Sequence, residues 1–146
     1  MNKVERAVSC FNDGFSCSQA VLSTYGEQFG LDRETALKVA GAFGGGMGHM
    51  GETCGAVTGA LMVTGLKYGQ TRVEDKEPKK KTYRLVKEFA EKFKVRNGSI
   101  NCTELLGCDL STPEGMQRAK ERGLFTTVCP KFVQDAAEIL EELIEE

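Results

Sequence analysis

The chain has 146 residues, six cysteines and a formal net charge of −2 at pH 7. A chain of this length can fold without disulfides, and its charge argues against a nucleic-acid binder. The first residues lack a signal-peptide pattern, and the longest apolar run, 56–66, is too short to cross a bilayer. We therefore expect one cytoplasmic domain over residues 1–146, with cysteines present as thiols, metal ligands or redox centres.

Apolar residues recur at helical spacing along the chain, and no stretch alternates as a strand does. The spacing and the local stop signals predict helices at 4–8, 17–29, after Asp32, 53–68, 79–95, 103–106, after Pro113, and 130–145. In the longest of these, Tyr83, Val86, Ala90 and Phe93 are expected to share the apolar face. The fold class is all-α, a compact multi-helix bundle.

Glycines crowd the segment 41–51 before the central helix and recur at Gly51, Gly55 and Gly59. We expect a flexible loop there, but not a phosphate loop, because the lysine and the preceding strand of that motif are absent. A glycine inside a helix costs up to about 1 kcal/mol relative to alanine, so the repeat needs a compensating gain. Close helix packing is one such gain. Approach of a cofactor is the other, which makes Gly55 and Gly59 candidate cofactor-binding residues.

Four of the six cysteines stand where a helix is expected to begin: Cys17, Cys54, Cys102 and Cys129. Cys17 follows Ser16 in a capping-box pattern, and Cys102 follows Asn101, a good N-cap residue. Cys129 precedes Pro130 and is itself the expected cap. Helix N-termini carry partial positive charge and favour thiolate over thiol. If the four helix ends converge, their thiolates share one electropositive pocket.

Several chemistries remain open for these cysteines. No C-x-x-C pair is present, which disfavours a thioredoxin-type motif and a zinc ribbon. Four thiolates suit an iron–sulfur cluster or a tetrahedral zinc ion, whereas two suffice for a redox disulfide. Cys10 fits an inert buried role, and both Cys10 and Cys108 are kept as secondary candidates. His49, the one histidine, is either a ligand, a proton donor or a surface residue.

The chain resembles the redox-active family named for the pattern Cys, Gly-Cys-Ala-x-x-Gly, Cys, Cys. The matching stretches cover nearly the whole chain and lie at residues 14–21, 43–48, 54–59, 102–107 and 129–133. This chain reads Cys54-Gly55-Ala56 where the family name has Gly-Cys-Ala. The resemblance implies a small helical bacterial or archaeal protein with a redox role, sometimes encoded near transporter genes. The cluster-bearing part of split-Soret cytochromes is similar in a looser way.

The leading hypothesis is electron transfer through an iron–sulfur cluster held by the four cysteines Cys17, Cys54, Cys102 and Cys129, with an unknown redox partner protein. One alternative is a cofactor-free thiol–disulfide couple between two of the same residues. Another is a non-enzymatic binding module, with structural zinc or no metal, that recognises a transporter or another helical partner. Whether the protein is an oxidoreductase or an electron carrier stays open, as does its oligomeric state, a homo-oligomer included.

Overall fold

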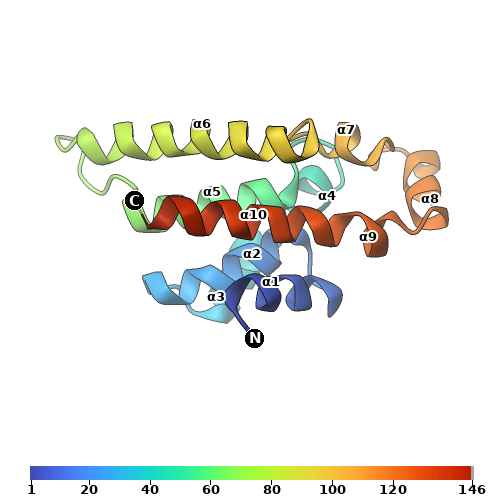
Figure 1. The fold of residues 1–146 in the computed structure, drawn as a ribbon, viewed down its shortest axis with the longest axis horizontal. Coiled ribbons are helices and arrows are strands. Elements are labelled where there is room, and N and C mark those ends of the chain that lie inside the picture. The colour runs from blue at the N-terminus through green and yellow to red at the C-terminus, as the bar shows by residue number, and fades with distance from the viewer. Residues whose placement is uncertain (146) are drawn as a thin grey trace.

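The computed structural model describes residues 1–145, which form the all-α bundle expected from the sequence (Figure 1). Its helices are α1 (Lys3–Asn12), α2 (Cys17–Gly26), η1 (Glu27–Phe29), α3 (Arg33–Ala40), α4 (Gly44–Met47), α5 (Gly55–Tyr68), α6 (Glu77–Asn97), α7 (Cys102–Leu106), α8 (Pro113–Glu121), α9 (Leu124–Thr127) and α10 (Cys129–Ile144). Within these residues, the only strand-like pairing is an isolated antiparallel bridge between Thr53 and Asn101. Residue 146 of the predicted domain lies outside the described residues.

Helix α5 lies at the centre of the bundle and contacts α2, α6 and α10. Figure 1 shows α6 along one side and α1 to α3 along the other, with α5 and α10 between them. The approach of α5 to α2 is close because Gly59 has no side chain. A Cβ atom at this position would lie 2.9 Å from the Ser18 carbonyl oxygen. The small residues of the central helix thus bring α2 and α5 into contact.

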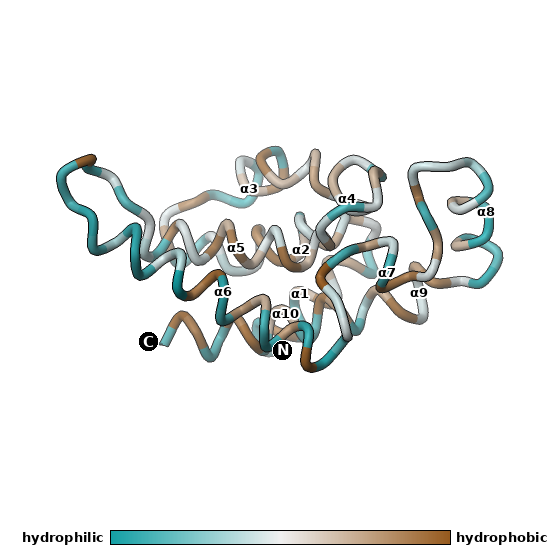
Figure 2. Tube along the Cα trace, turned by 90° about the horizontal axis from the view of Figure 1, so that it is seen from above, coloured by the Kyte–Doolittle hydropathy of each residue, from teal (hydrophilic) through white to brown (hydrophobic). Residues whose placement is uncertain are grey.

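The buried face of α6 differs from the predicted one. Leu85, Phe89 and Phe93, spaced four residues apart, are completely buried. The Phe89 and Phe93 rings stack with their centroids 6.1 Å apart. Tyr83, predicted to share that face, is 59% exposed, because it lies on the flank of the stripe that faces the core. The outer side of α6 and the turn before it are hydrophilic (Figure 2).

Other differences concern short elements. The four-residue helix α9 was not predicted, because a single turn carries no measurable apolar period. Helix α6 begins earlier than expected, at Glu77, with Pro78 in its first turn. Within residues 1–145, no helix combines the length and the apolar character that a bilayer crossing requires.

Candidate functional site: four cysteines around one cavity

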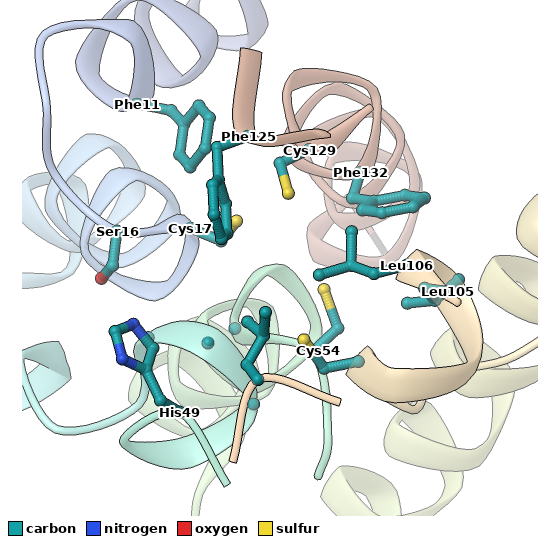
Figure 3. A pocket seen from close by; sticks show the side chains of 16 residues that line it. Phe11, Ser16, Cys17, His49, Cys54, Leu105, Leu106, Phe125, Cys129 and Phe132 are labelled. Carbon is teal, nitrogen blue, oxygen red and sulfur yellow. The ribbon is translucent and has the colours of Figure 1, made fainter. Parts of the chain in front are cut away.

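The structure brings the four cysteines singled out from the sequence to one cavity of about 140 Å³: Cys17, Cys54, Cys102 and Cys129 (Figure 3). They come from the starts of α2, α5, α7 and α10. Cys10 and Cys108 do not line this cavity, although both are buried. All six cysteines are free. Convergence from four separate elements is the central geometric fact of the site.

Two of the cysteines occupy the helix positions expected from their caps. Cys17 is the first residue of α2, and the Ser16 side chain and Gln19 form the reciprocal capping box. Cys102 is the first residue of α7, and the Asn101 side chain accepts a hydrogen bond from a first-turn backbone amide. These caps satisfy amide groups that would otherwise lack partners. Local sequence therefore fixes how Cys17 and Cys102 enter the cavity.

The other two cysteines are displaced by one position from the prediction. Cys54 is the N-cap of α5 and not a residue inside it. Cys129 is the first residue of α10, and Val128 takes the cap position that Cys129 was expected to hold. The α9 turn explains this shift, because the Val128 N–H bonds to the Leu124 carbonyl and so ends α9 directly at the start of α10.

A short backbone pairing holds Cys54 beside Cys102. The Cys54 N–H donates to the Ile100 carbonyl at 2.8 Å, and the Cys102 N–H donates to the Glu52 carbonyl at 2.6 Å. The Thr103 hydroxyl adds a hydrogen bond of 2.9 Å to the Gly51 carbonyl. This pairing is the isolated bridge described above. These hydrogen bonds alone fix the helix starts at Cys54 and Cys102 relative to one another, without any contribution from side-chain packing.

The glycine-rich segment, expected to be a flexible loop, forms a left-handed turn. Residues 45–49 all have positive φ, between 61° and 71°. Met47 and His49 adopt this conformation although side chains disfavour it by about 1–2 kcal/mol per residue. Backbone hydrogen bonds close the turn, among them Met47 N–H to Phe43 carbonyl at 3.1 Å. The turn borders the cavity next to Cys102.

Two glycines clear the space between the cysteines. A Cβ atom at Gly46 would lie 2.7 Å from the Cys102 Cβ and 2.6 Å from the Glu52 nitrogen. A Cβ atom at Gly55 would lie 3.3 Å from the Cys17 Cβ. Gly55 lines the cavity, as a cofactor-binding role requires, whereas Gly59 does not line it and packs against α2. The helix-packing explanation therefore accounts for Gly59.

Electrostatics at the site differ from the expected set of four thiolates. The hydrogen bond to Cys129, followed by burial, raises the pKa of the Cys17 thiol well above its ordinary value. The same interaction lowers the pKa of Cys129, so the negative charge of the pair is favoured on Cys129. Cys129 also starts a sixteen-residue helix, whose dipole favours a thiolate there.

Burial dominates at the remaining two cysteines. It raises the pKa of Cys54 to about 11, although the backbone amides of Ala56 and Val57 act in the opposite direction. Burial also raises the pKa of Cys102 to about 12, and the nearby Cys54 and Cys129 add to this shift. Without a bound cation, the site therefore holds mostly neutral thiols, because four thiolates in an apolar cavity would repel one another.

The spacing of the sulfur atoms matters for any metal. Within residues 1–145, no group of three or more His, Cys, Asp or Glu side chains is arranged to hold one ion. Four thiolates on one zinc ion would lie about 3.8 Å apart, since Zn–S bonds are about 2.3 Å. Here the four side chains surround a cavity and do not converge on a point. That arrangement leaves room for a group larger than an ion.

The sequence did not indicate the rest of the cavity wall. Aromatic and aliphatic side chains complete it, among them Phe11, Phe125 and Phe132. Phe125 belongs to α9, which was not predicted. Nothing in the sequence distinguishes these three phenylalanines from the other apolar residues of the chain. His49, left open between ligand and surface residue, lies at the cavity with its side chain exposed.

Comparison with known proteins identifies the family of this chain. Residues 15–143 match the family model described as "Putative redox-active protein (C_GCAxxG_C_C)". The chain belongs to this family. The matched stretch contains all four cysteines of the cavity. No curated protein and no solved structure matches the chain.

Proposed function

We propose that this member of the redox-active family transfers single electrons through an iron–sulfur cluster bound by Cys17, Cys54, Cys102 and Cys129. The observation that carries the proposal is the convergence of four cysteines from four elements on one cavity. Thiolates are the usual ligands of such clusters, and a cluster needs space between its ligands that a single ion does not. The donor set and the cavity both fit this group.

The roles of the chain's own residues follow from their positions. The four cysteines would ligate the cluster as thiolates, and its positive iron ions would offset the raised pKa values of Cys54 and Cys102. Phe11 and Phe125 would form apolar walls beside the cluster. When bound, the cluster supplies reversible one-electron chemistry, which a redox partner protein would complete as donor or acceptor.

A second function is favoured by the interaction of Cys17 with Cys129 at the same cavity, which shifts the pKa values of the two thiols in opposite directions. Two such thiols could form a disulfide by exchange with a protein or small-molecule disulfide. One S–S bond would form here, one would break in the oxidant, and two protons would pass to the released thiols. Cys54 and Cys102 would then have no role. To bind a structural zinc ion, the four sulfur atoms would have to move closer together.

Anaerobic purification followed by an absorption spectrum and an assay of iron and sulfide separates these functions. We expect brown protein whose bound iron is lost in each single alanine variant of the four cysteines. Cys108→Ala is the matched control, because Cys108 is buried but lies off the cavity. Colourless protein whose free-thiol count falls reversibly by two, only when both Cys17 and Cys129 are present, would instead establish the disulfide couple. One zinc per chain that oxidants do not displace would favour the binding module, with a transporter among its candidate partners.

A further inference from the structure

His49 joins the interior of the cysteine cavity to solvent. Its side chain is exposed, yet it lines the same cavity as Cys54 and Cys102, which are 4% and 7% exposed. Figure 3 shows the imidazole ring at the edge of the cavity near Ser16, on the side opposite Phe132. The cavity therefore opens to solvent beside this ring, and the opening leads to the sulfur atoms.

The backbone holds His49 in this position at an energetic cost. Its φ of 63° belongs to the left-handed turn, in a conformation that costs a side chain-bearing residue about 1–2 kcal/mol. The ring lies against Gly45, where a Cβ atom would overlap the imidazole. Strain of this kind persists where the surrounding structure imposes it, and it concentrates at functional sites. The left-handed backbone and the contact with Gly45 together hold the ring at the opening.

The imidazole is also the polar group of the opening that has no partner. Within residues 1–145, neither ring nitrogen makes a hydrogen bond to the protein. The neighbouring Ser16 hydroxyl is engaged with the Ser18 hydroxyl at 3.1 Å and the Gln19 amide oxygen at 3.2 Å. Phe11 and Phe125 supply apolar walls. A molecule in the opening would meet this imidazole beside the apolar walls.

We propose that His49 forms the entrance through which small uncharged molecules with one hydrogen-bonding end reach the four sulfur atoms. The cavity of about 140 Å³ holds roughly four or five water-sized groups, at about 30 Å³ each. A charged molecule would lose its hydration among the aromatic walls, whereas an uncharged one places its polar end on the imidazole. This inference deepens the proposed function, since it rests on chemistry at the four sulfurs, but it applies with or without a cluster.

The entrance is tested by alkylation of the metal-free full chain with iodoacetamide at fixed pH, with each cysteine followed by mass spectrometry. His49→Gly removes the group that binds the amide end of the reagent, so we expect alkylation of Cys17 and Cys54 to slow by roughly threefold or more. Met47→Gly is the matched control, because Met47 has the same left-handed backbone but does not line the cavity. Both variants should melt at a higher temperature, whereas only His49→Gly should react more slowly. Equal alkylation rates in the two variants would contradict the proposed role of His49 at the entrance.

The hydrogen bond is tested with acetamide, an unreactive relative of the reagent. Acetamide should slow alkylation of Cys54 in the wild-type protein and protect it less in His49→Gly. Equal protection in both proteins would remove His49 from the binding of such molecules. Cys108, off the cavity, reports any general loosening of the fold. Iron binding is not measured in either experiment. A negative result for the His49 entrance therefore does not contradict cluster binding, and a protein without a cluster does not contradict the entrance.

Discussion

The side chains of Cys17 and Cys129 meet at one cavity and shift each other's pKa in opposite directions, although the two residues lie near opposite ends of the chain. The pair joins the first residue of α2 to the first residue of α10. The interaction makes the two sulfurs unequal, since Cys17 is favoured as the thiol and Cys129 as the thiolate. This inequality has a measurable consequence in the metal-free protein.

Cys129 should ionise at a lower pH than an ordinary cysteine, whose pKa is about 8.5. Because the interaction with Cys17 lowers the pKa of Cys129, Cys17→Ala should raise the midpoint of its pH-dependent alkylation. Cys54 and Cys102, with pKa values of about 11 and about 12, should stay protonated through that range. Mass spectrometry of alkylated peptides across pH measures each midpoint. An unchanged Cys129 midpoint in Cys17→Ala would show that the interaction has no such effect.

Gly46→Ala should damage both stability and the site. The new methyl group would meet the Cys102 Cβ and the Glu52 amide at less than 3 Å, on a backbone with φ of 71°. We expect a loss of about 2–4 kcal/mol in the free energy of unfolding, together with reduced iron binding. Gly65→Ala in α5 is the control, since nothing lies within 4 Å of its Cβ position. That change should stabilise the helix by up to about 1 kcal/mol. Equal effects of the two substitutions in urea denaturation would contradict this packing.

Sequence alone predicted the parts of this site that depend on local chemistry. Ser16 and Asn101 are strong N-caps, so the helix starts at Cys17 and Cys102 could be placed correctly. The left-handed turn could not be predicted, because His49 adopts a conformation that its own residue type disfavours. The contact of Gly46 with Cys102 could not be predicted either, because it depends on packing between segments far apart in sequence.

The convergence of the four cysteines on one cavity could not be predicted without the three-dimensional fold. Helix starts were inferred from caps, but only the pairing of Gly51–Cys54 with residues 100–103 brings two of them side by side. The family resemblance pointed to the four cysteines without giving their geometry. Thiolate character was also overestimated, since the helix-end effect is local and the burial of Cys54 outweighs it. The roles of these cysteines as ligands stay a prediction.

Gly59→Ala separates packing from cofactor approach. The methyl group would lie 2.9 Å from the Ser18 carbonyl and 3.1 Å from the Val21 Cβ, so α2 and α5 must move apart. We expect a loss of about 1–3 kcal/mol in unfolding free energy, with iron content per folded chain unchanged. Gly55→Ala, on the cavity wall, should lower both quantities. Iron loss in Gly59→Ala without any loss of stability would restore Gly59 as a cofactor-binding residue.

Tyr25→Phe probes the core away from the cavity. Tyr25 is completely buried, and its hydroxyl donates a 2.8 Å hydrogen bond to the Glu141 carboxylate. Burial, and then this bond, raises the pKa of Tyr25 far above that of free tyrosine. Losing the bond should cost about 1–2 kcal/mol at neutral pH.

The pH dependence of that cost has a definite sign. The unfolded chain ionises Tyr25 near pH 10, while the folded chain keeps it protonated, so the wild-type advantage is full below pH 10 and declines above it. Urea denaturation of both proteins at pH 7 and above pH 10 measures the difference. A gap that stays constant across this range would contradict the raised pKa.

Iron X-ray absorption on anaerobically loaded wild-type protein tests the central claim most directly. An iron–sulfur cluster held by the four cysteines predicts a first shell of sulfur alone and a second shell of neighbouring iron. Both signals should be lost in an alanine variant of any of the four and kept in Cys108→Ala. A first shell of oxygen or nitrogen, with no iron neighbour, would contradict a cysteine-bound cluster.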